Sequence, residues 1–277
     1  MSRIAAIQMA SGPQIQANLM EAGRLIKQAS IKGANLLVLP ENFAIMGNTE
    51  QDKVFSAEVY GSGKIQDFIR EQAQKHKVWI VAGTIPLQSE QSGKVYASSI
   101  LYNANGEQVA RYDKMHLFDV RLKASGSANE ETYNESATTV FGDKHVVVET
   151  PFGRIGMAIC YDLRFPHFFQ RLVDLGAEIF VLPAAFTEQT GKAHWEVLLR
   201  SRAIENLSYM VAAAQGGYHV NGRITYGNSM IVDPWGQIND RLEKTPGIVN
   251  AEIDLDCLYG TRKYFPVLEH RRDRINQ

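Results

Sequence analysis

The sequence predicts an α/β fold, a four-layer αββα sandwich built from two pseudo-symmetric halves. An internal repeat is the main sign of this symmetry, because GANLLVLPENF at 33–43 returns as GAEIFVLPAAF at 176–186. Each copy follows a short apolar stretch and an amphipathic helical pattern, which gives both halves the order strand, helix, strand. The apolar runs are too continuous for strands with one face in water. Helices must therefore cover one face of each sheet, and the two sheets must pack on each other.

The first half is expected to begin with a strand at 3–9 and a helix at 15–31, followed by the repeated strand. A second helix at 62–76, with its apolar side chains on one face, precedes a strand at 78–84. The half closes with a hairpin across 99–112, whose NANG turn suits a tight reversal between two strands.

The second half repeats this order with a strand at 154–160 and a helix at 167–175, followed by its own copy of the repeated strand. A helix at 194–205 and a strand at 209–215 come next. A hairpin from 229 onward, with the turn DPWG, closes this half as NANG closes the first. Because strands, helices and hairpin follow the same order in both halves, the two halves are expected to share one fold.

Gly33 and Gly176 stand where a helix C-cap favours glycine, just before the two repeated strands. No Pro/Ser-rich linker separates the halves, so residues 1–277 are expected to form a single domain. The stretch 121–143 lacks clear periodicity and is expected to be the longest loop, and loops of that length are often functional. The charged tail 263–277 is expected either to reach a partner subunit or to be solvated.

The composition excludes several classes of protein. A formal net charge of -1 and a pI near 6.7 disfavour a nucleic-acid partner. No apolar run approaches a membrane span of about 18 residues, and the first residues do not have the pattern of a secretory signal. A cytoplasmic location is therefore expected, with Cys160 and Cys257 as reduced thiols. No HExxH or paired Cys/His spacing indicates a metal, and no cofactor is expected.

Three residues are candidates for chemistry. Cys160 ends an apolar strand where a helix should begin, a position that exposes a thiol and favours its thiolate, although buried cysteines often only fill space. Glu41 follows the first repeated strand, while the repeat places Ala184 at the equivalent position. It is either a general base or a helix-start acid. Lys114 follows the first hairpin and is either a cation beside the thiol or a solvated surface lysine.

The segments PENF, KMHLF and ICYDLRFP together resemble the three signature segments of the nitrilase, or carbon–nitrogen hydrolase, superfamily. The resemblance extends to IAAIQM, AHWEVLLRSRAIEN and YGNSMIVDPWG. It implies the same αββα sandwich, with Cys160 as nucleophile and Glu41 as the base that also activates the deacylating water. It further implies an oxyanion hole made by Lys114 and the backbone N–H of Tyr161, and assembly as a homodimer or larger homo-oligomer.

A further glutamate assists the lysine in this superfamily, usually ahead of a Pro-Gly pair. The resemblance places Glu135 in this role, although Phe141-Gly142 stands where Pro-Gly is expected. Because of this departure, the nearby Glu130 and Glu131 remain alternatives.

Within the superfamily, AHWEVLLRSRAIE and SMIVDPWG are most similar to the deaminated glutathione amidases. The resemblance implies hydrolysis of a small amide to 2-oxoglutarate and cysteinylglycine. Asn228 departs from the expected histidine of YGHSM and is expected to affect the pocket wall. A substrate carboxylate needs a cation, and Arg164 is the candidate clamp unless it only pairs with Asp162. The arginines considered next are Arg171 and Arg202.

Three other functions are also compatible with the sequence. An omega-amidase acting on 2-oxoglutaramate, or on another small amide, would use the same residues. A papain-like hydrolase would need a histidine base, for which His116, His167 or His194 is available. A catalytically silent binding module could keep the fold and lose the activity.

Overall fold

The structure of this chain is a computed structural model that describes residues 2–123 and 130–272. Its first sheet has the strand order β18-β1-β2-β3-β5-β4, and β6 and β9 also pair with β5. The strands of this sheet are β1 (Ser2–Gln8), β2 (Leu36–Val38), β3 (Trp79–Val81), β4 (Ile85–Gln88), β5 (Val95–Tyr102), β6 (Gln108–Asp113), β9 (Thr139–Val140) and β18 (Gly247–Ile253).

The second sheet has the order β10-β11-β12-β13-β16-β17, with β11, β12 and β13 parallel to one another. Its strands are β10 (Val147–Thr150), β11 (Gly153–Met157), β12 (Ile179–Ala184), β13 (Tyr209–Ala214), β16 (Met230–Val232) and β17 (Ile238–Arg241). Two separate hairpins complete the strands: β7 (Asp119–Lys123) with β8 (Glu130–Asn134), and β14 (Gly216–Tyr218) with β15 (Ile224–Tyr226).

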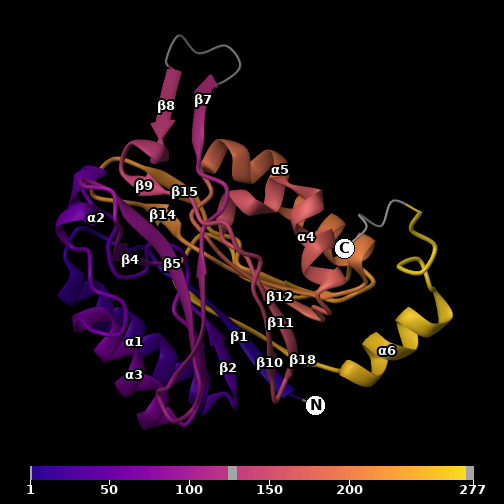
Figure 1. Ribbon diagram of the computed structural model, residues 1–277. Coiled ribbons are helices and arrows are strands. Elements are labelled where there is room, and N and C mark those ends of the chain that lie inside the picture. The colour runs from indigo at the N-terminus through magenta and orange to yellow at the C-terminus, as the bar shows by residue number, and fades with distance from the viewer. Residues whose placement is uncertain (1, 124–129, 273–277) are drawn as a thin grey trace.

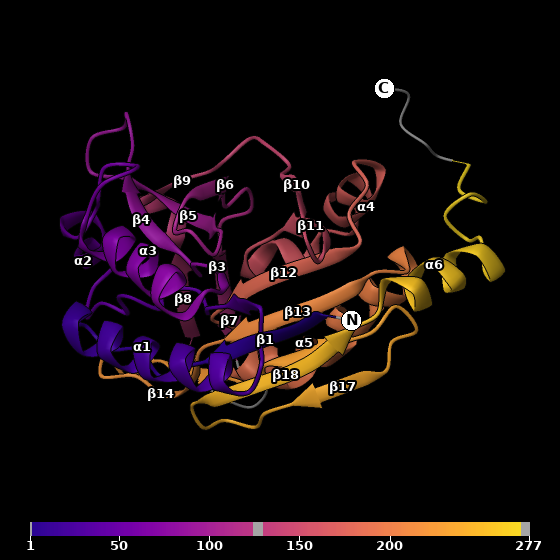
Figure 2. The ribbon, with the colours of Figure 1, turned by 90° about the horizontal axis from the view of Figure 1, so that it is seen from below.

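Helices lie on the outer face of each sheet (Figures 1 and 2). α1 (Ile15–Ile31) and α3 (Lys64–His76) cover the first sheet, and α4 (Pro166–Asp174) and α5 (Glu188–Asn206) cover the second. The remaining helices are α2 (Gln51–Phe55), α6 (Leu255–Tyr264) and the short 3-10 turns η1 (Glu135–Ala137) and η2 (Cys160–Arg164). The four layers predicted from the repeat are confirmed. None of the described helices has the length and apolar character needed to cross a membrane.

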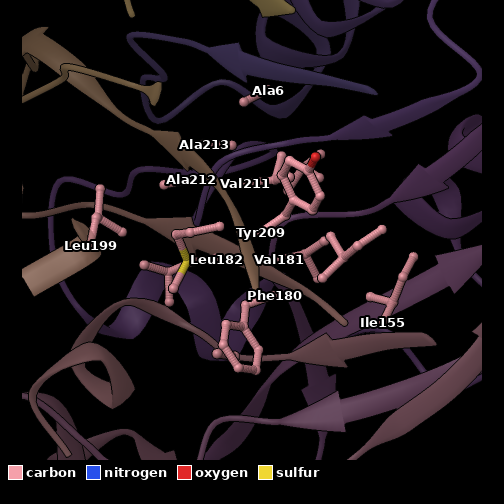
Figure 3. Close-up of a cluster of buried hydrophobic side chains, with 14 of the residues drawn as sticks. Ala6, Ile155, Phe180, Val181, Leu182, Leu199, Tyr209, Val211, Ala212 and Ala213 are labelled. Atoms are coloured by element: carbon pink, nitrogen blue, oxygen red, sulfur yellow. The ribbon is translucent and has the colours of Figure 1, made fainter. Parts of the chain in front are cut away.

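The side chains of the central strands alternate between two cores, as the period of a strand requires. Ile4 and Ala6 of β1 belong to the core between the sheets, whereas Ala5 and Ile7 belong to the core beneath α1 and α3. Figure 3 shows Ala6 near Ala213 of β13 within the first of these cores. Because both faces of such a strand are buried, its sequence is an unbroken apolar run.

The predicted hairpin turns are both confirmed. The N–H of Gly106 donates to the carbonyl of Asn103, and the N–H of Gly236 donates to the carbonyl of Asp233, each at 2.9 Å. Gly33 has a φ of +85° and Gly176 a φ of +97°, so both occupy the left-handed conformation that favours glycine after a helix.

Three expectations about the elements need correction. The stretch 121–143 is not one long loop, because it contains the end of β7 together with β8, η1 and β9, while 124–129 lie outside the described residues. The helix expected at 194–205 begins earlier, at Glu188, where the Thr187 side chain caps it by accepting from the N–H of Thr190. The halves are also not closed units, because β18 comes from the end of the chain and pairs antiparallel with β1 along its whole length.

Candidate active site

Glu41, Lys114 and Cys160 come together although they lie in three distant parts of the chain. Each follows a strand: Glu41 follows β2, Lys114 follows β6 and Cys160 follows β11. The ammonium Nζ of Lys114 donates to Glu41 Oε1 at 2.8 Å and to both carboxylate oxygens of Glu135 at 2.8 and 2.9 Å. The side chains of Lys114, Glu41 and Glu135 are only 2%, 6% and 12% exposed. A buried cation is thus held between two carboxylates.

Cys160 occupies a sharp turn between β11 and η2. Its φ of +46° lies in the left-handed region, which a residue with a side chain seldom adopts and which indicates local strain. The turn places the buried thiol beside the carboxylate of Glu41 and the backbone N–H of Ala185, both of which act on its pKa. Cys257, in contrast, is exposed, so the two cysteines do not form a disulfide.

The charges of the cluster follow from burial and from these contacts. Burial raises the pKa of the Cys160 thiol well above its ordinary value, and the charge of Glu41 adds to this, although Lys114 opposes it. Burial acts to lower the pKa of Lys114, but the carboxylates of Glu135 and Glu41 outweigh it and leave that pKa raised. Burial would likewise raise the pKa of Glu135, but the charges of Lys114 and Lys53, together with the hydrogen bonds from Lys114 and the N–H of Phe118, outweigh it and the pKa is lowered. The resting cluster therefore holds a neutral thiol beside a carboxylate that can accept its proton.

Glu135 is the glutamate beside Lys114, and the alternatives Glu130 and Glu131 are not. Both lie on β8 with exposed side chains; Glu131 accepts from the hydroxyl of Tyr133, and Glu130 lies 3.9 Å from Arg121. A second donor also holds Glu135, because its Oε2 accepts a hydrogen bond from the backbone N–H of Phe118 at 2.7 Å.

Phe141-Gly142 stands where Pro-Gly is expected, and it keeps the glycine, which is the residue that the geometry requires. The N–H of Gly142 donates to the carbonyl of Lys114 at 2.8 Å. A Cβ at this position would lie 2.2 Å from the backbone oxygen of Asp113, so no larger residue fits without a backbone shift. The side chain of Phe141 is 66% exposed and is not needed for this contact.

Asp162, which the sequence analysis considered only as an ion-pair partner of Arg164, connects the lysine and cysteine segments. Its fully buried carboxylate accepts from the Tyr112 hydroxyl at 2.6 Å, the Ile159 N–H at 2.8 Å and the imidazole Nδ1 of His116 at 2.6 Å. The only sign of this role in the sequence is an acidic residue within ICYDLRFP.

Gln215 is a second supporting residue that the sequence analysis missed. Its side-chain amide donates to the backbone carbonyl of Glu41 at 2.9 Å and to the hydroxyl of Ser11 at 2.8 Å. Ser11 in turn donates to the carbonyl of Phe43 at 2.8 Å. These bonds hold the loop that carries Glu41 against the end of β13. A buried glutamine directly after the apolar run of β13 was the available signal.

A cavity of about 210 Å³ opens onto the cluster. Besides Glu41, Lys114, Glu135 and Cys160, it is lined by aromatic side chains and by two further cations, namely Phe118, Tyr133, Tyr161, Phe186, Lys53 and Arg223. Its size suits a small molecule, and its lining combines apolar rings with three cations and three carboxylates, the latter being Glu41, Glu50 and Glu135.

A sequence model of the carbon–nitrogen hydrolase family matches residues 3–263. The chain belongs to this family. Among its relatives, deaminated glutathione amidase from Synechocystis is 44% identical over 270 residues, which cover 96% of this chain and 97% of the relative. The human deaminated glutathione amidase is 40% identical over 273 residues, covering 97% and 82% of the two chains. The crystal structure of the Caenorhabditis elegans NitFhit protein matches with a TM-score of 0.90 and 35% identity, over 100% of this chain and 66% of that one.

The geometry of this carbon–nitrogen hydrolase leaves no place for a histidine base. All seven histidines are among the described residues, and none of them lines the cavity. His116 is bound to Asp162 and stacks on Phe165 with ring centroids 3.7 Å apart. His194 contacts Arg164, and His167 contacts Gln170 on the surface. The papain-like alternative is therefore disfavoured.

The expected carboxylate clamp, Arg164, does not line the cavity of this hydrolase. Its guanidinium lies over the rings of Tyr161 and Phe186, at 5.8 and 5.4 Å, and its Nη1 is 3.3 Å from Nδ1 of His194. It therefore contacts two residues of the cavity wall without lining the cavity itself. Arg171 and Arg202 do not line the cavity either, and Nε of Arg202 donates to the carbonyl of Leu163.

Asn228 is also not in the cavity wall, contrary to expectation. It has a φ of +57°, a left-handed conformation that asparagine adopts more readily than most residues. Its side-chain oxygen accepts from Nη2 of Arg241 at 2.6 Å, and its backbone carbonyl accepts from the indole of Trp195 at 2.8 Å. Asn228 therefore stabilises the packing of α5 against the second sheet.

Proposed function

We propose that this carbon–nitrogen hydrolase cleaves the amide of deaminated glutathione, with Cys160 as the nucleophile and a thioester as the intermediate. The observation that carries the mechanism is the buried thiol of Cys160 beside the carboxylate of Glu41 in a small cavity. The two nearly full-length relatives named as deaminated glutathione amidases support the substrate. The products are 2-oxoglutarate and cysteinylglycine.

Acylation begins when the Cys160 sulfur attacks the amide carbon while Glu41 takes the thiol proton. Because burial and Glu41 keep the pKa of the thiol raised, proton removal must accompany the attack. Negative charge then develops on the amide oxygen, where Lys114 and the backbone N–H of Tyr161 stabilise it. The carbon–nitrogen bond breaks, and the proton held by Glu41 passes to the leaving amine.

In deacylation, water becomes the nucleophile and the Cys160 sulfur becomes the leaving group. Water gives a proton to Glu41 and attacks the thioester carbon, and the carbon–sulfur bond breaks to release the acid. The proton on Glu41 then returns to the Cys160 thiolate. Glu41 thus acts twice as a base and twice as an acid, which requires a position within reach of both the sulfur and the substrate.

Glu135 keeps Lys114 charged throughout this cycle. Burial favours the neutral amine, which stabilises an oxyanion poorly, and the charge of Glu135 opposes this effect of burial on the pKa of Lys114. The paired carboxylate also fixes the direction of the ammonium, because it binds Nζ through both oxygens. Glu135 is thus a positioning residue in this proposal.

The family match over residues 3–263 also supports our interpretation of the chain as one domain. The homodimer or larger assembly implied by the resemblance stays a prediction, which light scattering of the purified protein can check.

A substrate panel tests the proposed function. The purified enzyme is incubated with deaminated glutathione, 2-oxoglutaramate, a neutral short-chain amide and a nitrile, and the products are measured by mass spectrometry. The highest kcat/KM is expected for deaminated glutathione, with 2-oxoglutarate and cysteinylglycine formed in equal amounts. A clear preference for 2-oxoglutaramate would instead identify an omega-amidase. The absence of turnover with every compound would favour the silent binding module.

A further inference from the structure

Arg223 brings a cation to the cavity from a hairpin that takes no part in the proposed chemistry. It precedes β15 and lines the cavity, where its guanidinium lies 5.3 Å from the centre of the Tyr133 ring. Its Nη2 donates to the carbonyl of Ala185 at 2.8 Å. Because Ala185 also lies beside the Cys160 sulfur in the wall of the same cavity, one residue separates the guanidinium from the nucleophile.

Part of this guanidinium has no partner. The Nε of Arg223 is buried and makes no hydrogen bond within the part of the chain that the structure describes. The other cations of the cavity are paired, since Lys53 lies 2.6 Å from Glu50, and Lys114 is held by Glu41 and Glu135. For Arg223, in contrast, no carboxylate lies within 4.0 Å among residues 2–123 and 130–272. Such an orphaned donor is costly unless a ligand satisfies it.

We propose that Arg223 binds the carboxylate on the acyl part of the substrate and so selects amides of 2-oxo dicarboxylic acids. This inference rests on the proposed function and deepens it. The Nε–H and an N–H of Nη2 lie on the side of a guanidinium that can bind a carboxylate through both oxygens. Because Nε is buried and Nη2 donates to the carbonyl of Ala185, the guanidinium must turn toward the cavity to bind the substrate in this way. A carboxylate that leaves water to enter the cavity needs such a partner, because an unpaired buried charge is strongly disfavoured.

The position of Arg223 favours the acyl carboxylate over the glycine carboxylate of the leaving group. When the amide carbon of a 2-oxoglutaryl group is bonded to Cys160, its carboxylate carbon is only four carbon–carbon bonds away. Arg223 is separated from the same sulfur by the single residue Ala185. The glycine carboxylate lies beyond a whole cysteinyl residue and therefore reaches a more distant part of the cavity.

A comparison of substrates with and without each carboxylate tests this assignment. The three compounds are deaminated glutathione, its analogue with the glycine carboxylate converted to a primary amide, and its analogue with the 2-oxo acid carboxylate converted in the same way. For Arg223→Gln, kcat/KM is expected to fall about ten- to a hundredfold with the first two compounds. With the third compound, which lacks the recognised carboxylate, wild type and variant should differ by less than about threefold.

Two further variants make the comparison specific. Arg121→Gln removes the same charge from an 80% exposed side chain on β7 and should leave all three rates at the wild-type level. Arg164→Gln removes an arginine that contacts Tyr161 and Phe186 but does not line the cavity, and any loss should be equal for the three compounds.

Three outcomes would overturn the proposal. An equal loss for all three compounds in Arg223→Gln would mean that Arg223 acts only by holding Ala185. A loss that follows the glycine carboxylate would place Arg223 at the leaving group, and a selective loss in Arg164→Gln alone would move the clamp to Arg164. Failure of the proposed function is distinguishable, because wild type would then not hydrolyse deaminated glutathione. In that case, 2-oxoglutaramate and its carboxylate-blocked analogue serve as the matched pair, since they have the same acyl part.

Discussion

The imidazole of His116 and the carboxylate of Asp162 are joined by a hydrogen bond of 2.6 Å from Nδ1 to Oδ1. This bond connects the segment that carries Lys114 to the turn that carries Cys160. The same carboxylate accepts the N–H of Ile159, directly before the nucleophile, and the hydroxyl of Tyr112. One buried acid, which contacts neither the ammonium nor the thiol through a hydrogen bond in the structure, therefore helps to fix their relative positions.

Replacement of Asp162 by asparagine should disturb this arrangement without removing a reacting group. The carboxylate accepts from four donors, two at each oxygen, because the backbone N–H of His116 also donates to it. An amide keeps only one acceptor oxygen, so the two donors that face its NH2 group lose their partner, at a cost of about 1–3 kcal/mol each in the free energy of unfolding. We expect kcat to fall at least about tenfold, because small displacements of reacting groups are costly. Chemical denaturation and steady-state kinetics measure both effects, with Asp256→Asn on the exposed start of α6 as control. Unchanged kcat together with lowered stability would limit Asp162 to folding.

The Glu135→Gln variant tests the second carboxylate beside Lys114. Loss of one charged partner of a buried ammonium should lower the free energy of unfolding by about 3 kcal/mol and reduce kcat about a hundredfold. Glu131→Gln is the matched control, because it makes the same change on the exposed strand β8. If both variants behave alike, Glu135 has no special relation to Lys114. Stability is measured by denaturant titration, and kcat is measured with the best substrate of the panel.

Cys160→Ala and Cys257→Ala form a pair that separates the buried thiol from the exposed one. The first should retain less than about a hundredth of the wild-type rate, because no other group of the cavity can form the thioester. It should keep its fold and bind substrate, which calorimetry can measure. The second should have a normal rate, because Cys257 is exposed on α6. Substantial turnover by Cys160→Ala would exclude the proposed nucleophile.

His219 should make stability sensitive to mildly acidic pH. Burial lowers its pKa, and the charge of Arg223 adds to this, although the hydrogen bond to the Ser11 carbonyl opposes it. Because the folded pKa lies below the unfolded value of about 6.5, the unfolded chain takes up the proton first as pH falls. The stabilisation by neutral His219 is therefore present above that value and is lost below it.

The free energy of unfolding, measured on both sides of about pH 6.5, checks this prediction. Wild type should lose more stability on acidification than His219→Gln, which cannot titrate. His76 and His145, whose pKa values are also lowered by burial, remain in both proteins and cancel in the comparison. Equal losses in the two proteins would mean that His219 does not contribute.

The fold was largely predictable because its central strands are buried on both faces. Apolar runs such as ANLLVLP left few alternatives to a covered sheet, and the repeat fixed the order of the elements in both halves. The strand β18 was missed because it lies outside the repeat and crosses back to the other sheet. The hairpin of β7 and β8 was missed because β7 alternates between partly buried and exposed residues and β8 is mostly exposed, which gives little apolar periodicity.

The site was predictable only where residues lie within recognisable segments. Glu41, Lys114 and Cys160 follow strands within such segments, and the structure brings them together. Asp162 and Gln215 act through hydrogen bonds to residues 50 and 174 positions away in the chain, which no local pattern reveals. Arg223 belongs to a loop without a motif, so only the geometry of the cavity distinguishes it from Arg164.

The most direct test of the mechanism is intact-protein mass spectrometry of Glu41→Gln mixed with deaminated glutathione. An amide at position 41 cannot activate water, so any acyl-enzyme that forms should be hydrolysed slowly and accumulate. The account predicts an added mass equal to 2-oxoglutarate less one water, located by peptide mapping on Cys160 and absent from Cys160→Ala. Normal steady-state turnover by Glu41→Gln with no adduct on Cys160 would contradict it.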